Sequence, residues 1–379
     1  MNAKKLRDII FPLHRYLGLL VGLILIVVGL TGSLLVFQHE IDQWMIQQQF
    51  GEVIPQEERV PMEVAVNNVK TAYEERPELK ISGVNTSPKN SSYIFQLQAP
   101  NKKRTQVFVD PYTGKILGSR QRESGIIDLT FKLHYQLLAG ETGRIIVGIS
   151  ALFMVILSIT GVALWSGWRK LISGFKIKWN AHPKRVNYDI HKVAGIVTAV
   201  FLGVIAFTGF CWNFYDFAKP AIYAVTFSPK PPEPVSVPIA VQVPIEIGEI
   251  LQRAETALPG AETTYISFPT EPEEAFTFYK KQPQETTDFG NSAVYLDQYS
   301  GEILYVQDGL KPSLGDRIFN SFSPLHYGTF GGLPTRIFYL FVGLAPLILS
   351  VTGFVMWWYR KRKNMQQSEA IVANSGGRG

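Results

Sequence analysis

Cysteine is almost absent from this sequence, which has one cysteine, Cys211, among its 379 residues. A single thiol cannot form an internal disulfide, ligate an iron–sulfur cluster through cysteines alone or provide the C-x-x-C-H attachment of covalent haem. The sequence also lacks a G-x-G-x-x-G turn opening a βα unit, a phosphate-binding P-loop and an H-E-x-x-H pair. Flavin or nicotinamide binding, nucleotide hydrolysis and zinc proteolysis therefore have no support.

Charged residues are missing from four long apolar runs, which cover residues 17–37, 145–168, 193–215 and 337–359. Each run is long enough to cross a hydrocarbon core of about 30 Å as a helix. Shorter runs could be buried helices of a soluble domain, but runs of this length indicate membrane spans. We therefore predict an α-helical membrane protein, a four-span bundle with a lipid bilayer as its environment.

Lysine and arginine are concentrated beside the ends of these runs. They lie before the first run, between the second and the third, and after the fourth. In chain order these residues are Lys4, Lys5, Arg7, Arg169, Lys170, Lys176, Lys178, Lys184, Arg185, Arg360, Lys361, Arg362 and Lys363. Because such cations are retained in the cytoplasm, we predict a bacterial inner-membrane protein with both termini cytoplasmic and an uncleaved first span. The net charge of +6 is largely this set, which indicates an anionic inner leaflet and no nucleic-acid partner.

The chain contains an internal repeat. The segment LHYQLLAGETGR at Leu133 matches LHYGTFGGLPTR at Leu325, and in both copies a Thr-Gly pair begins 26 residues after the histidine. HRYLGL at His14 matches HKVAGI at His191, again followed by a Thr-Gly pair, here 17 residues after the histidine. Each copy carries two spans, so both enter the membrane in the same direction. The pattern predicts a tandem duplication.

Alternating apolar and polar segments between the spans predict two periplasmic α+β domains. VFVDPYTGKIL at Val107 and VYLDQYSGEIL at Val294 share a strand, a turn whose glycine supplies a positive φ, and a second strand. The expected order is a cytoplasmic start and first span at 1–39, a first domain at 40–143, a second span at 144–168, a cytoplasmic loop at 169–190, a third span at 191–215, a second domain at 216–336, a fourth span at 337–359 and a cytoplasmic tail at 360–379.

Four of the six histidines are reproduced by the repeat, His14 with His191 and His134 with His326. A neutral imidazole offers one nitrogen to a metal and the other to a hydrogen bond, and two facing imidazoles can hold a haem iron within a helix bundle. The expected topology places His14 and His191 near the cytoplasmic face and His134 and His326 near the outer face. We therefore predict two haem sites stacked across the bilayer as an electron relay.

Glycines and one unpaired histidine lie close to these positions. Gly18 and Gly195 follow the first- and third-span histidines by four residues, on the same helix face, where a flat macrocycle could pack. Close approach of neighbouring helices is the alternative role for such glycines. His39 has no partner in the repeat, where Asp216 stands instead. It could ligate the outer haem in place of one partner, lie at a substrate site or only occupy the interface.

Arginine and lysine recur beside the histidines as well. Arg144 and Arg336 each follow an outer histidine by ten residues and could pair with haem propionates. Arg15 and Lys192 could do so on the cytoplasmic side. The alternative for all of them is anchoring at the membrane interface, where long cationic side chains reach back to water.

The repeated histidine segments, the Thr-Gly pairs and the VDPYTG and LDQYSG turns resemble the PepSY-associated transmembrane family over nearly the whole chain. In size and layout the chain is similar to the FoxB-type siderophore-iron reductases of that family. The resemblance implies a di-haem b protein that reduces ferric iron carried by a periplasmic siderophore. It maps the axial ligands onto His14, His134, His191 and His326.

Two functional hypotheses follow. In the first, the chain is an oxidoreductase that passes electrons from quinol or a cytoplasmic reductase through two haem b groups to a ferric siderophore, with no catalytic side chain beyond the haem. In the second, the PepSY-like domains bind or regulate a periplasmic protein, and the spans only anchor them. Transport through the bundle is disfavoured because the spans carry few polar groups of the kind that line substrate pathways.

Overall fold

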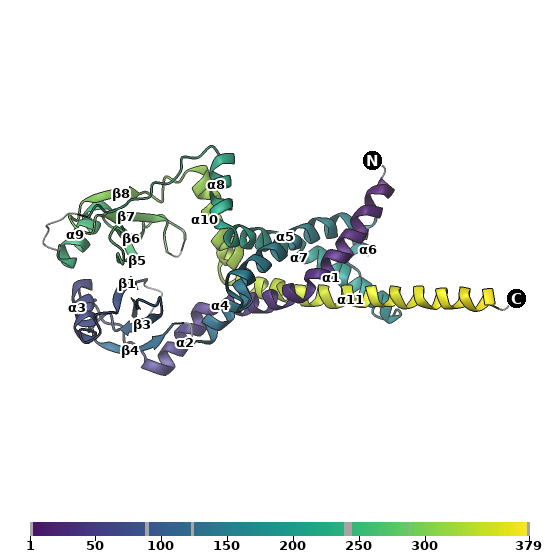
Figure 1. Cartoon of the computed structure of the whole chain (residues 1–379), viewed down its shortest axis with the longest axis horizontal. Coiled ribbons are helices and arrows are strands. Elements are labelled where there is room, and N and C mark those ends of the chain that lie inside the picture. The colour runs from purple at the N-terminus through teal and green to yellow at the C-terminus, as the bar shows by residue number, and fades with distance from the viewer. Residues whose placement is uncertain (1–2, 88–90, 123–124, 239–244, 288, 377–379) are drawn as a thin grey trace. The chain divides into compact units, whose positions relative to one another are not determined.

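The computed structural model describes residues 3–87, 91–122, 125–238, 245–287 and 289–376. The chain divides into two compact units (Figure 1). We call Met1–Phe37, Leu129–Lys219 and Ser321–Gly379 the helical unit, and Gln38–Asp128 and Pro220–Asn320 the sheet unit. Each unit is assembled from segments of both halves of the chain, so neither unit corresponds to one half.

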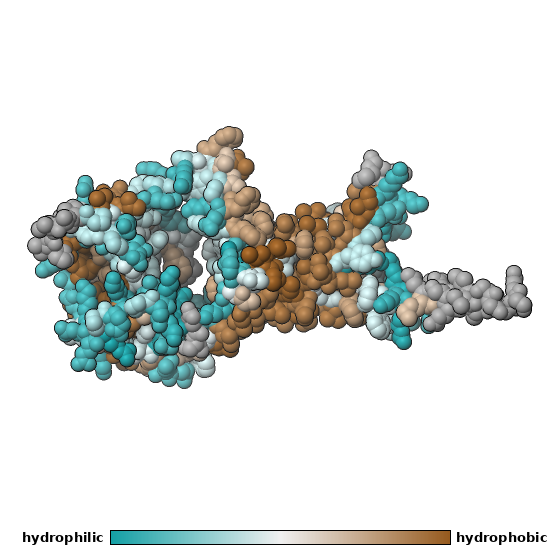
Figure 2. All heavy atoms as spheres, viewed as in Figure 1, coloured by the Kyte–Doolittle hydropathy of each residue, from teal (hydrophilic) through white to brown (hydrophobic). Residues whose placement is uncertain are grey.

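The helical unit is built on four long helices, which are α1 (Ala3–Leu35), α5 (Gly140–Leu164), α7 (Pro183–Asn213) and α11 (Gly332–Gly376). All four are long and apolar enough to cross a membrane, which confirms a multi-pass membrane protein. Hydrophobic residues cover the sides of this bundle, as expected for a surface that faces lipid chains (Figure 2). The helical unit also contains the short helices η1 (Ser166–Arg169), α6 (Leu171–Phe175) and η2 (Thr329–Gly331). Helices α4 (Ile126–Gln136), α8 (Tyr215–Val225) and α10 (Leu314–Tyr327) each have residues in both units.

Each long helix begins before the apolar run that predicted it. Helix α7 begins at Pro183, well before the predicted span, because proline is favoured in the first turn and the side chain of His182 accepts a hydrogen bond from the Lys184 amide. Buried Asp189 then joins Arg185 and Lys192 in one ion-pair cluster on the first turns of α7. The predicted cytoplasmic loop at 169–190 is therefore largely helical.

The four long helices pack as a ring in which α1 and α7 each contact both α5 and α11. Helices α1 and α7 thus face each other across the interior. The core between them contains Val21, Met154, Leu202 and Val342. Helices α1 and α11 pack closely at Gly29, where an added Cβ would lie 2.5 Å from the carbonyl oxygen of Gly343. This position shows the close packing that small residues permit in membrane bundles.

The sheet unit is one antiparallel sheet of eight strands in the order β4-β3-β2-β1-β5-β6-β7-β8. Its strands are β1 (Lys80–Asn85), β2 (Tyr93–Gln98), β3 (Arg104–Val109), β4 (Ile116–Gln121), β5 (Glu262–Ser267), β6 (Phe276–Lys281), β7 (Ser292–Leu296) and β8 (Ile303–Gln307). Its helices are α2 (Gln38–Phe50), α3 (Met62–Ala72) and α9 (Ile247–Ala257). The two predicted α+β domains therefore share one sheet.

The shared sheet is joined where β1 pairs with β5, with Val84 opposite Ile266. Both residues belong to one continuous core, which includes Val66 of α3 and Ile250 of α9. Pairing β1 with β5 removes an exposed edge from each set of four strands. The predicted turns are confirmed, because Gly114 and Gly301 have φ values of 70° and 66°.

Candidate functional site

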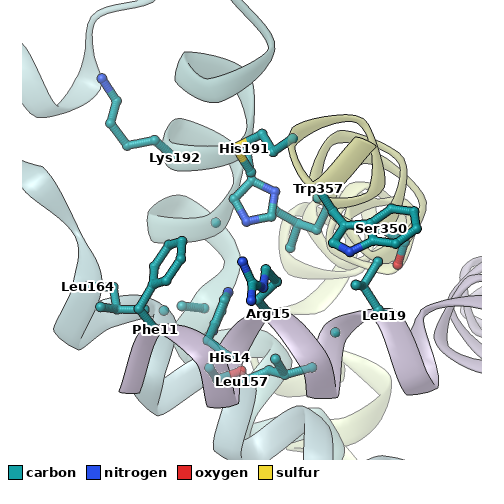
Figure 3. A pocket seen from close by; sticks show the side chains of 18 of the residues that line it. Phe11, His14, Arg15, Leu19, Leu157, Leu164, His191, Lys192, Ser350 and Trp357 are labelled. Carbon is teal, nitrogen blue, oxygen red and sulfur yellow. The ribbon is translucent and has the colours of Figure 1, made fainter. Parts of the chain in front are cut away.

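The first pair of histidines lies in the interior of the helical unit. His14 of α1 and His191 of α7 face each other with ring centroids 6.3 Å apart and ring planes at 89° (Figure 3). They meet because α1 and α7 occupy opposite positions in the ring of helices. The repeat places these two residues at matching points of the sequence, and the structure brings them together. We call them the first pair.

The second pair is formed by His134 of α4 and His326 of α10, again with ring centroids 6.3 Å apart and with ring planes at 78°. Trp212 lies beside His326, with 4.8 Å between the ring centroids. Burial lowers the pKa of both histidines, that of His326 to about 3. Both imidazoles are therefore neutral near pH 7, the form in which histidine binds a metal.

Each of the four histidines is held by a threonine that precedes a glycine. The Nδ1 atom lies 2.8 Å from the threonine Oγ1 in three cases and 3.2 Å in the fourth; the contacts are His14 with Thr160, His191 with Thr352, His326 with Thr208 and, at 3.2 Å, His134 with Thr31. The threonine comes from another helix every time, so the contact ties two helices together. The same local unit therefore occurs four times.

The direction of these hydrogen bonds follows from the other contacts of the threonines. The Thr160 hydroxyl donates to the Ile156 carbonyl at 2.7 Å and must therefore accept from His14. The other three threonines donate to their own helices in the same way, Thr31 to Val27, Thr208 to Val204 and Thr352 to Ile348. His134 Nδ1 also lies 2.9 Å from the Val28 carbonyl, which can only accept. The Nδ1 atoms thus carry the protons, and the lone pairs of Nε2 remain available to a metal.

A cavity of about 310 Å³ lies around the first pair (Figure 3). Gly18 and Gly195 both line it. A Cβ added at either position would meet a leucine methyl, at 3.7 and 3.6 Å, which is ordinary contact. These glycines are therefore not points of close helix approach like Gly29. They leave the cavity wall beside the histidines without a side chain at these two positions.

Cationic side chains line the same cavity but differ in what they bind. The Lys192 ammonium is committed to the carboxylate of Asp189 at 3.0 Å and to two backbone carbonyls. The Arg15 Nε is buried and has no hydrogen-bond partner among the residues that the structure describes. A buried donor of this kind suits an anionic group inside the cavity.

The two arginines predicted near the second pair contact helix ends. Arg144 donates to the Asn213 carbonyl, at the last residue of α7, and pairs with Glu141. Arg336 donates to the Val36 carbonyl at 2.7 Å, directly after α1. Cations at these positions satisfy carbonyls that a helix end leaves without a partner. A role toward haem propionates stays a prediction for both. His39 lies in α2 of the sheet unit, and its predicted roles are untested.

The two imidazoles of each pair could hold a metal between them. Two imidazoles leave most coordination positions of such a metal to other ligands, which a macrocyclic cofactor would fill. A metal–imidazole bond is about 2 Å long, so a metal shared by two rings puts their centroids about 6 Å apart. Both pairs have this separation.

A comparison with known protein families gives a match over most of the chain. The model of the PepSY-associated TM region matches residues 11–360. The chain belongs to the PepSY-associated transmembrane family. Among curated proteins, no relative matches it. The match begins before His14 and ends after Thr352, so it includes all four histidine–threonine contacts.

The threonines are the site residues of this PepSY-associated transmembrane protein that the sequence interpretation missed. The Thr-Gly pairs served there only as markers of the repeat. The four Thr-Gly pairs recur at fixed sequence distances from the histidines, and this recurrence is the signal that could have identified them as site residues. It could not show which histidine each pair contacts, because Thr31 binds a histidine more than a hundred residues away along the chain.

Proposed function

We propose that this protein is a di-haem b ferric-siderophore reductase of the FoxB type in a bacterial inner membrane. The observation that carries the proposal is the presence of two facing imidazole pairs in one bundle, each with its centroids 6.3 Å apart. A haem b in each pair would supply one-electron redox chemistry. The protein would provide the axial nitrogens, a wall without side chains at Gly18 and Gly195, and the buried Arg15 donor.

We further propose that electrons enter at the first pair and leave at the second. Three arginines line the first-pair cavity, Arg7, Arg15 and Arg360, and cations of this kind favour the cytoplasmic face. The proposed orientation leaves both termini inside and the sheet unit in the periplasm. Quinol or a cytoplasmic reductase would donate at the first pair. The two pairs divide a core of about 30 Å into shorter steps.

The reaction proposed at the second pair is transfer of one electron to a chelated ferric ion. The haem that His134 and His326 would hold would supply one electron, which would reduce the ferric iron of the siderophore to ferrous iron. Hard oxygen ligands hold the ferrous ion less tightly, so reduction releases iron from the chelate. The siderophore is a substrate, and the chain would need no catalytic side chain beyond those that hold the haems.

The test is anaerobic reoxidation of the purified protein in detergent. The protein is reduced with dithionite, freed of excess reductant and mixed with a ferric hydroxamate siderophore. We expect the Soret band to return to its oxidised position while ferrous iron appears on a colorimetric chelator, one iron for each haem oxidised. The gallium siderophore has the same shape but is not reduced, so it should leave the spectrum unchanged.

Two outcomes would count against this function in different ways. A haem protein that reoxidises with neither hydroxamate nor catecholate ferric chelates is not a siderophore reductase. A colourless protein would contradict the haem sites themselves and leave an anchored, non-redox PepSY module as the better account.

A further inference from the structure

The ring planes of the two histidines are nearly perpendicular in both pairs, at 89° and 78°. The pairs lie on different helices, so a single accident of packing does not explain a shared angle. What the pairs have in common is the contact of each Nδ1 with a Thr-Gly pair on another helix. The threonine and the glycine act on the ring in different ways.

The threonine fixes the rotation of the imidazole ring about the Cβ–Cγ bond of the histidine. Thr160 gives its own proton to the Ile156 carbonyl, so its accepting lone pair has a fixed direction toward His14. Thr352 is held by Ile348 in the same way and faces His191. A rotation of either ring would break its Nδ1 hydrogen bond inside an apolar bundle, where the loss of a hydrogen bond is costly.

The glycine leaves room for the edge of the ring. An added Cβ at Gly161 would lie 3.3 Å from Cε1 of His14, and one at Gly32 would lie 2.9 Å from Cε1 of His134. Gly209 stands in the same relation to His326, at 3.3 Å, and a larger residue at any of these three positions would push against the ring edge. At Gly353 an added Cβ would lie 3.6 Å from Cε1 of His191, in ordinary contact. The Thr-Gly pairs at His14, His134 and His326 are therefore two-part clamps on one imidazole each, whereas His191 is held by its threonine.

We propose that the four Thr-Gly pairs are positioning residues that hold the axial imidazole planes near perpendicular at both haems. The proposal rests on the di-haem function above. Each imidazole interacts chiefly with the iron dπ orbital that is perpendicular to its own plane. Perpendicular planes affect both dπ orbitals alike and leave them nearly equal in energy, whereas parallel planes separate them. The ferric protein should then give strongly anisotropic low-spin electron paramagnetic resonance signals, and its potentials should lie above those of parallel-plane sites.

The first measurement needs no variant. Frozen, oxidised wild-type protein is expected to show strongly anisotropic low-spin signals from both haems. A well-resolved rhombic spectrum, which is typical of parallel planes, would overturn the proposal even if both haems are present and active. Wild-type protein without haem would instead overturn the proposed function, so the two failures are distinguishable.

The second measurement removes one acceptor. Thr160→Val keeps the shape of the side chain but cannot accept from His14, while Thr160→Ser retains the hydroxyl. We expect Thr160→Val to change the signal and the midpoint potential of one haem and to leave the other as in the wild type. Thr160→Ser should restore both. The matched control is Thr198→Val, since Thr198 is a buried threonine of α7 that donates to the Ala194 carbonyl of its own helix.

Gly161→Ala tests the glycine part of the clamp. It also keeps the proposal testable if Thr160→Val loses its haem. The added methyl presses on His14 while the Thr160 hydrogen bond remains, so the signal of one haem should shift and haem content should not. Gly203→Ala is its control, because that methyl would meet Ser158 at 3.4 Å, in ordinary contact. Identical signals and potentials in Thr160→Val, Gly161→Ala and their controls would overturn the proposal.

Discussion

The two histidine pairs share one geometry but differ in what surrounds them. The first pair sits on two long spanning helices and borders a cavity lined by glycines and by the buried donor of Arg15. The second pair sits on the short helices α4 and α10, beside Trp212. The shared part is the imidazole with its threonine and glycine, so we infer that this unit is what the site requires. The surroundings are free to differ.

The hydrogen bonds of the pairs differ at one histidine. Three histidines have their short contact, 2.8 Å, with a threonine hydroxyl. At His134 the order is reversed, because the Val28 carbonyl lies at 2.9 Å and the Thr31 hydroxyl at 3.2 Å. A carbonyl oxygen is the stronger acceptor and makes the imidazole a more electron-rich ligand. We therefore expect the two haems to have different midpoint potentials. We also expect His134 to tolerate the loss of its threonine better than His326 does.

Removing a histidine should have the largest effect and should separate the pairs. We expect His14→Ala and His326→Ala each to lose one of two haems, because a single imidazole with its facing ligand missing holds haem weakly. Either loss should abolish reduction of ferric siderophore by interrupting the relay. A pyridine haemochrome assay per mole of chain measures the first effect. Retention of both haems in either variant would refute the ligand assignment.

Filling the first-pair cavity should affect one haem only. Gly18→Leu places a bulky side chain beside His14, where Gly18 now has no side chain. The haem of the first pair should be lost while that of the second pair remains. Val200→Leu, at a lipid-exposed position of α7, should retain both. If Gly18→Leu bound two haems with wild-type spectra, the cavity would not be a haem site.

Losing a threonine should be more harmful at Thr208 than at Thr31. Mutation of such outer partners of metal ligands typically costs about 10- to 100-fold in affinity. Thr208→Val should reach that range, since it removes the 2.8 Å contact of His326. Thr31→Val should fall below it, because the shorter contact of His134, with the Val28 carbonyl, remains. Haem transfer to apomyoglobin measures both losses. Equal losses would mean that the carbonyl contact does not distinguish His134 from His326, which has a backbone hydrogen bond with Ile205.

The smallest effect is expected at the arginines of the second pair. Arg336→Gln removes a donor from the carbonyl of Val36 and should lower the stability of the folded bundle by about 1 to 2 kcal/mol. Thermal unfolding in detergent, with Arg144→Gln as the counterpart in the other copy, gives the comparison. A shift in the potential of one haem, without loss of thermal stability, would instead support the predicted contact with a propionate.

The spans and the pairing of the histidines could be predicted from the sequence because both follow from strong local signals. Uncharged runs long enough to cross a membrane are rare in soluble domains, and a repeat relates His14 to His191 without any structure. Other features depend on contacts between distant segments. The sequences of β1 and β5 do not indicate that these strands pair with each other, since an edge strand and a central strand can have the same alternation of apolar and polar residues. The partners of the Thr-Gly pairs depend likewise on how the helices are ordered around the bundle.

The central claim is that two imidazole pairs in one bundle each hold a haem. The most direct test is to count haem b and iron per chain in the purified wild-type protein and to record its oxidised and dithionite-reduced spectra. Two haems per chain, with the spectrum of six-coordinate low-spin iron in both oxidation states, is the result predicted here. A protein that is colourless when expressed with ample haem, or one that binds a single haem, would contradict it.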